Sequence, residues 1–249
     1  MCANYEGFRP LSMSPPSDFL GKCKYHGRML LDLQMATVYR DLKNVLPHFK
    51  GKVLDIGCGQ SPFKFLLSPS TAQYIGIDIV DAEKFDYRNP DITQFDGENI
   101  PFEDGYFDAL ICTEVLEHVE KYQKLIEEMY RVTKKGGSGI VTIPWSARYH
   151  YIPYDFFRYT PSSLKTMFSQ FGEVQITARG TDAVSIVSKM IVLWCRNIFP
   201  AKLSQLLWIP VWVLTLPVLG LSILAAHLCI LFSLGSEDDP LGYTVRFTK

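Results

Sequence analysis

The sequence of 249 residues lacks several features that mark common classes of protein. Its charges nearly cancel, with 25 Lys and Arg against 26 Asp and Glu, so no basic excess indicates a general nucleic-acid binder. None of its six cysteines belongs to a CxxC pair, which excludes the usual zinc-ribbon spacing. The first residues lack the apolar core of a secretory signal, and we therefore expect a reducing, cytoplasmic setting.

Charge is also missing from one long stretch near the C-terminus. No Asp, Glu, Lys or Arg occurs from Leu203 to Ser236, and residues 206–234 read LLWIPVWVLTLPVLGLSILAAHLCILFSL. A run of about 18 or more apolar residues is typical of a membrane segment. The alternative is a buried helical hairpin or a dimer interface, but a soluble helix usually keeps a polar stripe and this run has almost none. We therefore predict contact with a membrane.

The rest of the chain alternates between strand-like and helix-like segments. Residues 1–28 are rich in Pro, Ser and Gly, which predicts an irregular N-terminal arm. Strands are predicted at 52–57, 73–78, 107–113, 138–144 and 173–180, and helices at 29–46, 61–67, 114–133 and 162–172. Thr160 and Pro161 are typical of the cap and first turn of a helix. This alternation predicts an α/β fold, with a mainly parallel sheet between helices.

A glycine loop follows the first predicted strand in VLDIGCGQSPF. Gly57 and Gly59 let the backbone approach a ligand that a Cβ would block. Asp78 ends the next strand, where a carboxylate can accept hydrogen bonds from two ribose hydroxyls. A tight turn with a capping Asp is the structural alternative. A dinucleotide site would have glycine in place of Pro62, and Asp55 is atypical of NAD sites, so an NAD enzyme is the weaker reading.

In combination these motifs resemble the class I S-adenosylmethionine (SAM)-dependent methyltransferases, and most closely their type 11 branch. The matching stretches are VLDIGCGQ, YIGIDI, FDGENIPFEDGYFDALICTEVLEHV and the GG of KKGG, and the resemblance covers roughly residues 50–180. It implies a Rossmann-like, seven-stranded sheet whose last strand is antiparallel and lies in the middle of the sheet. It also implies SAM as the cofactor.

The resemblance assigns roles to particular residues. The cofactor-binding set that it implies is Asp55, Gly57, Gly59, Asp78, Asp96, Gly97 and Thr113. Asp55 would hold the amino group of SAM, Asp78 would bind its ribose, and Asp96 would accept from the adenine amine. These roles suit carboxylates that face N–H or O–H donors. Asp96 before Gly97 is also typical of an ordinary turn.

Two polar stretches follow strands at the edge where a substrate would bind. In TEVLEHV, Glu114 and His118 would share one face of a helix, although a capped helix start with a structural His is the alternative. Residues 144–161 combine Arg, His, Asp and many aromatic residues, which is typical of a functional loop and predicts a substrate lid. A similar pattern is familiar in bacterial methyltransferases encoded among glycan-assembly genes.

Methyl transfer to a hydroxyl needs a general base. His150 is the first candidate because its ordinary pKa suits a base at neutral pH, and Asp155 and His118 come next. Asp155 and Arg158 are alternatively a simple i,i+3 ion pair. A metal bound by His118, His150 and Asp155 is conceivable, but nothing in their spacing is diagnostic, so the sequence predicts no metal site.

The last residues, 242–249, alternate as a strand does and match the seventh strand of the resemblance. The apolar run then lies between the sixth and seventh strands and must enter and leave a membrane by the same face. Pro217 and Gly220 predict a break within it, as a re-entrant hairpin or as two short spans. Residues 183–199 predict an amphipathic helix at the interface, with Lys189 and Arg196 reaching toward headgroups.

The sequence therefore predicts a methyltransferase domain of residues 29–181 with 241–249, and a membrane-associating helical insertion of residues 182–240. The predicted function is SAM-dependent methylation, by O-methylation, of a lipid-linked sugar, a lipid head group or a quinone-like ring. The predicted place is the cytoplasmic face of a membrane. The alternative is a protein that keeps the fold as a non-catalytic SAM-binding or scaffolding module.

Overall fold

The computed structural model describes residues 12–79, 89, 92–198 and 203–249. Its helices are α1 (Phe19–Met29), α2 (Leu33–Val45), α3 (Tyr122–Val132), α4 (Pro161–Met167), α5 (Asp182–Ile198), α6 (Ile209–Leu214) and α7 (Leu216–Phe232). Its short 3-10 helices are η1 (Leu46–His48), η2 (Lys64–Leu66), η4 (Leu116–His118) and η5 (Leu203–Trp208). Its strands are β1 (Gly51–Ile56), β2 (Ala72–Ile79), β3 (Thr93–Phe95), β4 (Phe107–Thr113), β5 (Thr133–Pro144), β6 (Glu173–Arg179) and β7 (Gly242–Thr248).

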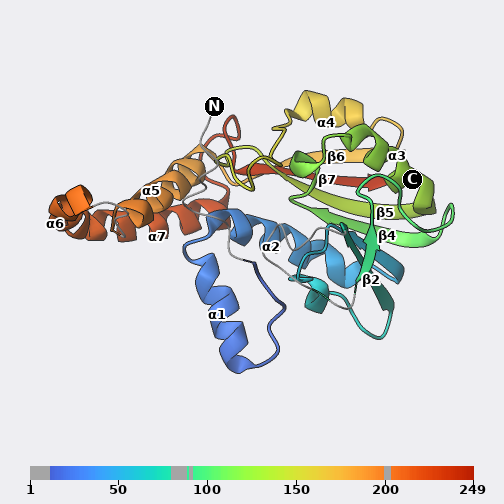
Figure 1. The fold of residues 1–249 in the computed structure, drawn as a ribbon, viewed down its shortest axis with the longest axis horizontal. Helices are drawn as coiled ribbons and strands as arrows, with labels where there is room; N and C mark the ends of the chain where they lie inside the picture. Colours follow the sequence, from blue (N-terminus) through green and yellow to red (C-terminus); the bar gives the residue numbers. More distant parts are fainter. Residues whose placement is uncertain (1–11, 80–88, 90–91, 199–202) are drawn as a thin grey trace.

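The strands form one seven-stranded sheet in the order β3-β2-β1-β4-β5-β7-β6. Neighbours from β3 to β5 are parallel, and β7 runs antiparallel to both β5 and β6. The last strand of the chain therefore lies inside the sheet, as predicted (Figure 1). This confirms the predicted α/β, Rossmann-like topology, and β3 is the strand that the sequence did not predict.

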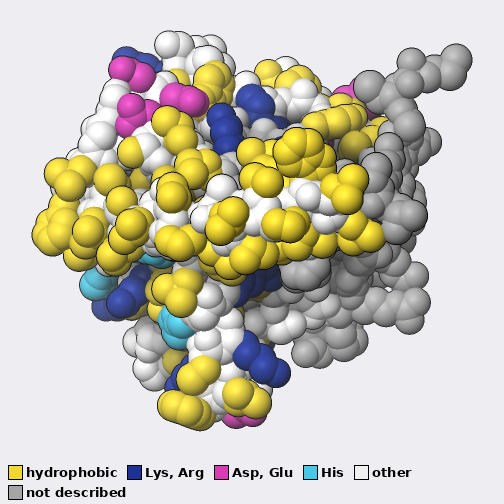
Figure 2. All heavy atoms as spheres, turned by 90° about the vertical axis from the view of Figure 1, so that its left-hand side faces the viewer, with side chains coloured by type: hydrophobic (Ala, Val, Ile, Leu, Met, Phe, Trp, Pro, Cys, Tyr) yellow, Lys and Arg dark blue, Asp and Glu magenta, His cyan; other side chains and the backbone are white. Residues whose placement is uncertain are grey.

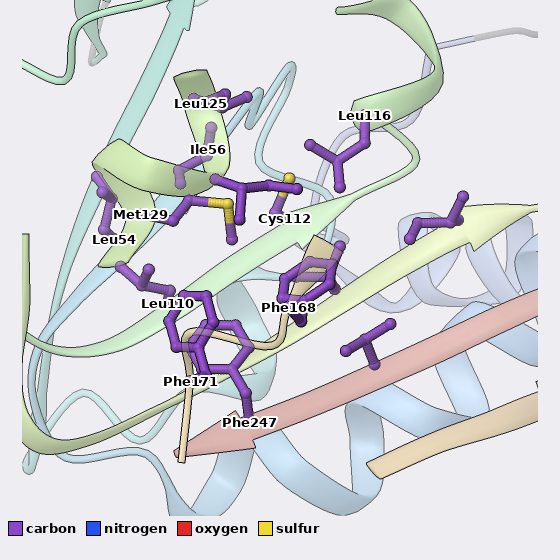
Figure 3. Packing of buried hydrophobic residues seen from close by; sticks show 14 of the residues in the cluster. Leu54, Ile56, Leu110, Cys112, Leu116, Leu125, Met129, Phe168, Phe171 and Phe247 are labelled. Carbon is purple, nitrogen blue, oxygen red and sulfur yellow. The ribbon is translucent and has the colours of Figure 1, made fainter. Parts of the chain in front are cut away.

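Helices cover both faces of the sheet (Figure 1). On one face, α3 and α4 pack over the strands, where Leu116, Met129 and Phe168 join strand residues such as Leu110 in the larger core (Figure 3). On the other face, the apolar side of α2, including Leu42, packs in a second cluster. Burial on both faces explains why the central strands are almost continuously apolar.

The N-terminal segment differs from its prediction. Residues 19–29 form α1, so the expectation of an irregular arm is wrong there, and residues 1–11 of that arm lie outside the described residues. Asp18 caps the helix by accepting from the backbone N–H of Gly21 at 2.6 Å. Tyr25 and Met29 are buried together with Met13, so tertiary packing holds a helix that the local composition did not favour.

The predicted long helix over 114–133 is also wrong at its start. Glu114 has a left-handed backbone with φ +53°, the short turn η4 follows, and the α-helix begins only at Tyr122. Glu114 and His118 therefore do not share a helical face. Similarly, the helix predicted at 61–67 is reduced to the three residues of η2.

The segment between β6 and β7 forms a helical arm, which we define as α5, η5, α6 and α7 (Figure 1). Hydrogen bonds close its base, because Asp182 N–H donates to Ser236 O at 2.9 Å and Thr181 Oγ1 donates to Leu234 O at 2.8 Å. The arm thus leaves and rejoins the sheet at one place.

The arm is built differently from the predicted hairpin. The long helices packed on each other are α5 and α7, not the two halves of the apolar run. The break lies at Thr215, between α6 and α7, rather than at Pro217 or Gly220. Pro217 is tolerated because it lies in the first turn of α7, where its missing N–H costs no intrahelical bond.

The arm exposes an unusually apolar surface. Large side chains along it are exposed, including Leu207 (83%), Leu214 (79%), Leu221 (69%) and Leu231 (71%). Seen from the end of the arm, hydrophobic side chains form a broad band across the molecule (Figure 2). Among the described residues no single helix has both the length and the apolar character to cross a membrane, but Leu206–Leu214 and Leu216–Phe232 meet that test together, bent by 54°.

Candidate functional site

The carboxyl ends of the parallel strands bring the predicted site residues to one edge of the sheet. Ile56 in β1 pairs with Ile77 in β2 and with Cys112 in β4, so the residues that follow these three lie side by side. They are the glycine loop, Asp78 and Thr113. This edge, which we call the cofactor edge, is where open α/β sheets bind ligands.

The glycine loop is tied to the acid at the end of β2. Gly59 has φ +51° and donates its N–H to Asp78 Oδ2 at 2.8 Å. Gly57 has φ +64°, and a Cβ there would lie 2.4 Å from Val115 Cγ2. Glycine at 57 is therefore required by the close approach of the chain after β4, besides any need of a ligand. Asp78 is buried, with 3% exposed, so its carboxylate both shapes the loop and faces the edge.

Asp55 is the second buried acid of the site. Its Oδ2 lies 2.8 Å from the hydroxyl of Tyr74, which also lies 2.8 Å from Ser61 Oγ. Its Oδ1 is buried and has no hydrogen-bond partner among residues 12–79, 89, 92–198 and 203–249. Burial, together with the nearby Asp78 carboxylate, raises the pKa of Asp55 to about 7. An orphaned, buried carboxylate oxygen beside a glycine loop fits an ammonium ligand, because such a ligand supplies donors and a compensating positive charge.

Asp96 and Gly97 follow β3 at the outer end of the same edge. Asp96 accepts from the backbone N–H groups of Glu98 and Asn99 at 2.8 and 2.6 Å, and from Asn99 Nδ2 at 2.7 Å. These hydrogen bonds hold its pKa down at about 2. The carboxylate of Asp96 thus stabilises a turn, as the structural alternative from the sequence predicted. It also remains exposed next to β2. Gly97 has φ +85°, which that turn requires.

Beyond Thr113, a buried ion pair joins β4 to β6. Arg179 is fully buried and donates Nη2 to Glu114 Oε1 at 2.6 Å, while Gln34 Nε2 donates to Glu114 Oε2 at 2.9 Å. Both oxygens of Glu114 are therefore engaged. This pair holds Glu114 in its left-handed conformation and sets the course of the chain into η4.

The two candidate histidines lie together, as the lid loop folds back onto η4. The ring centroids of His118 and His150 are 4.9 Å apart. His118 Nδ1 lies 2.6 Å from the carbonyl of Tyr154, and Phe156 N–H donates to Glu117 O at 2.8 Å. Burial and the neighbouring His150 lower the pKa of His118 to about 4.

Asp155 orients this cluster. It forms a two-pronged ion pair with Arg158, at 2.6 and 2.8 Å, and accepts from His150 N–H at 3.0 Å. His150 Nδ1 lies 3.1 Å from Asp155 Oδ2. Hydrogen bonds from His150 and Arg158 outweigh burial and push the pKa of Asp155 well below its usual range. The sequence left open whether Asp155 forms a simple ion pair with Arg158 or belongs to the site. In the structure Asp155 forms the ion pair and also contacts His150.

Several residues of the site were missed from the sequence. Tyr74 precedes Asp78 by four residues in β2, so both side chains lie on the same face of the strand. The alternation of side chains along a strand could have predicted this placement from the sequence. Asn89 donates Nδ2 to Gly59 O at 2.9 Å and bridges to Ser61 Oγ. Glu117 is fully buried, and the continuous helix predicted over residues 114–133 did not indicate that burial.

A comparison with protein families matches residues 54–141 to the type 11 methyltransferase family, described as a methyltransferase domain. The match covers the glycine loop, the strand with Asp78 and the strand that ends at Thr113. It stops within β5, before the lid loop and the arm.

Relatives agree with that match. The chain is 30% identical over 132 residues to an uncharacterized protein of Methanocaldococcus jannaschii, covering 51% of this chain and 56% of that protein. It is 31% identical over 99 residues to a ubiquinone biosynthesis O-methyltransferase of Dechloromonas aromatica, covering 34% of this chain and 41% of that protein. The chain thus spans about half the length of the curated relatives it matches.

A solved structure with a similar fold is a SAM-dependent methyltransferase from Archaeoglobus fulgidus. It covers 93% of this chain and 99% of its own, with a TM-score of 0.53 and 21% identity. That likeness supports the fold.

Proposed function

Because this chain carries a class I, SAM-dependent methyltransferase domain of the type 11 branch, we propose that it methylates an oxygen of a membrane-associated or lipid-linked acceptor. The acceptor classes that fit are a lipid-linked sugar, a lipid head group and a quinone-like ring. The observation that carries the proposal is that the arm and the cofactor edge lie at the same end of the sheet. The proposed place is the cytoplasmic face of a membrane.

The shared end follows from the strand register. β6 runs parallel to β5, since both are antiparallel to β7, and the carboxyl ends Pro144 and Arg179 both pair with Gly242. The arm begins at Asp182, directly after β6. Binding of the arm to a membrane would therefore bring the cofactor edge close to the lipid headgroups.

The orientation of the arm follows from its two faces. Val184 and Ile191 of α5 pack toward α7, whereas Lys189 and Arg196, two turns apart, are exposed on the side of α5 away from that contact. The outer side of α7 is apolar, with Leu221 and Leu228 exposed. We propose that the arm enters one leaflet at a slant, with the exposed side of α5 toward the headgroups and α7 toward the acyl chains.

The base of the arm is fixed to the enzyme body. Arg40 Nη1 donates to Ile230 O at 3.2 Å, and His227 Nε2 lies 3.0 Å from Leu30 O. Eleven residues of α7 precede His227, from Leu216 to Ala226, and at about 1.5 Å per residue they reach about 16 Å, roughly one leaflet of a bilayer core. Among the alternatives left open by the sequence, this length favours a re-entrant arm over two spans.

SAM supplies a methyl group on a positively charged sulfur, and transfer to oxygen forms a C–O bond, breaks the C–S bond and leaves S-adenosylhomocysteine. The chain must align the acceptor and accept its hydroxyl proton. His150 Nδ1 lies 2.9 Å from Arg148 O and 3.1 Å from Asp155 Oδ2, both of which are acceptors, so the ring proton resides on Nδ1. Nε2 is then the basic nitrogen, and we assign it as the general base.

Asp155 takes a different role from the one first considered. An acid held ionised by Arg158 is a weak base, so we propose that Asp155 positions His150. Residues 144–161 would act as the lid, and hydrogen bonds such as Tyr159 OH to Leu116 O at 3.1 Å hold them against η4. O-methylation is also the reaction in the name of the Dechloromonas aromatica relative.

The test has two stages with the full chain in detergent or nanodiscs. Calorimetric titration with SAM is expected to show binding to the wild-type chain. Release of S-adenosylhomocysteine is then measured with and without a membrane lipid extract. SAM binding together with lipid-dependent release of S-adenosylhomocysteine supports the proposal. SAM binding without such release, whichever acceptor is added, supports the non-catalytic alternative. Absence of SAM binding refutes both.

A further inference from the structure

Beside the cofactor edge, three side chains that could hold a metal ion lie close together. Each of Glu117, His118 and His150 offers one ligand atom, and these atoms all lie within 4.8 Å of one another. His118 Nε2 is 3.6 Å from Glu117 Oε1. We propose that Glu117, His118 and His150 bind a divalent transition-metal ion, with Zn²⁺ as the probe.

The observation that points to a ligand is the state of Glu117. Its side chain is 0% exposed, and among the described residues neither of its carboxylate oxygens has a hydrogen-bond partner. A buried carboxyl without partners costs several kcal/mol, whether it is charged or neutral. A bound cation would remove this cost.

Within the part of the chain that the structure describes, no neighbouring cation donates a hydrogen bond to this carboxylate. Arg158 is the nearby cation, but its Nη1 and Nη2 groups donate to Asp155 and to the carbonyls of Phe157 and Arg148. Glu114 is engaged by Arg179 and Gln34 and so is not a fourth ligand here.

Both histidines are oriented as metal ligands usually are. His118 Nδ1 lies 2.6 Å from the carbonyl of Tyr154, and His150 Nδ1 contacts the Arg148 carbonyl and the Asp155 carboxylate. Acceptors at Nδ1 place the ring proton there and leave Nε2 with the lone pair. Metal-binding histidines usually donate the other ring N–H to a carbonyl or carboxylate in this way, which fixes the ring and raises its basicity.

The ligand set selects the kind of ion. Two imidazoles and one carboxylate suit Zn²⁺, Fe²⁺ and similar ions, whereas Mg²⁺ and Ca²⁺ prefer oxygen ligands. Metal–nitrogen bonds of about 2.0–2.1 Å place ligand atoms roughly 3.4 Å apart, so the three side chains need to close by about 1 Å or somewhat more. Three protein ligands leave a position open, which is typical of a catalytic site rather than a structural one.

The consequence for the reaction rests on the proposed methyl transfer. An ion in this position, directly after β4, would lower the pKa of an acceptor hydroxyl that binds it, and the proton would pass to water. His150 would then act as a ligand, so its role as a base belongs to the metal-free protein. The acceptor would be a hydroxyl compound able to bind a metal through oxygen.

The test uses the full chain without a polyhistidine tag, stripped with a chelator and titrated with Zn²⁺ by calorimetry. We expect about one Zn²⁺ per chain, with at least about tenfold weaker binding in Glu117→Gln and in His150→Gln. Glu120→Gln, an exposed carboxylate three residues away, serves as the matched control and should bind as the wild type does. Co²⁺ in place of Zn²⁺ should give a visible absorption band that Glu117→Gln loses.

Zinc uptake by Glu117→Gln and His150→Gln equal to that of the wild type would overturn the site, as would no stoichiometric uptake by the wild type. Cooperative thermal unfolding of each variant checks that it is folded. If Glu117→Gln does not fold, His150→Gln still tests the site. SAM binding is measured on the same samples. Absence of zinc uptake by a wild type that binds SAM refutes only the metal site, and absence of SAM binding by a wild type that takes up zinc refutes only the proposed function.

Discussion

Asp55→Asn should stabilise the cofactor-free protein while weakening its hold on SAM. Asp55 is buried, with 3% exposed, and its Oδ1 has no partner in the part of the chain that the structure describes. The titratable groups around it are Tyr74 and Asp78 on β2, Cys58 in the glycine loop and Cys112 on β4. None of these is cationic, so with respect to the described residues ionised Asp55 is uncompensated until a positively charged ligand binds.

The magnitude follows from the pKa. Its ordinary value of 3.8 rises to about 7 in the folded protein. The folded state therefore binds the proton more tightly, and the destabilisation is absent below pH 3.8, grows as pH rises and is complete above about pH 7. At about 1.36 kcal/mol for each pKa unit, it amounts to roughly 4 kcal/mol at pH 8 and roughly 1.5 kcal/mol at pH 5.

The assay is thermal unfolding of wild type and Asp55→Asn at pH 5 and pH 8, without SAM. Asn cannot ionise, so the variant should exceed the wild type in free energy of unfolding by roughly 2–3 kcal/mol more at pH 8 than at pH 5. This corresponds to roughly 5–10 °C in Tm. Glu120→Gln, an exposed carboxylate, should show no such pH dependence. An Asp55→Asn advantage that stays constant with pH, or that shrinks as pH rises, would refute the reasoning. SAM should bind the variant at least about tenfold more weakly, because an ionic hydrogen bond is lost.

Three further changes test other parts of the account. Asp78→Ala should weaken SAM binding in calorimetry by about 1–3 kcal/mol, through loss of hydrogen bonds to a charged acceptor, and an unchanged affinity would contradict the ribose assignment. Arg179→Met should lower the free energy of unfolding in urea by about 3–5 kcal/mol, and adding Glu114→Gln should recover part of it; no recovery would mean that the uncompensated carboxylate is not the cause. Leu221→Glu should reduce flotation with anionic vesicles about tenfold, whereas Gln123→Glu, exposed on α3, should not; equal flotation would argue against arm insertion.

Local signals were enough to predict the cofactor half of the site. A strand, a glycine loop and an acid at the end of the next strand follow each other in the sequence, and parallel strands bring their carboxyl ends together in any such sheet. The apolar alternation of residues 242–249 predicted β7, and the resemblance placed it within the sheet. Gly59 and Asp78 are accordingly joined by a direct hydrogen bond.

Contacts between distant residues decided the rest. Glu114 and Arg179 are 65 residues apart, and their ion pair keeps the chain after β4 out of the helix that its periodicity predicts. Glu117 is buried by that turn, whereas a continuous helix gave no reason to single it out. In the arm, α7 pairs with α5 because Val187 and Ile191 face Leu219 and Ala226, a choice of partner that apolar composition alone does not specify.

The most direct test of the proposed function follows the methyl group itself. The full chain is incubated with membranes and SAM labelled in its methyl group, and the lipid extract is then separated from the aqueous phase. The account predicts label in a lipid-extracted product that gains one CH₂, at a rate that falls sharply with Asp78→Ala. Label that reaches only water-soluble products, or a lipid product formed equally by Asp78→Ala, would contradict it.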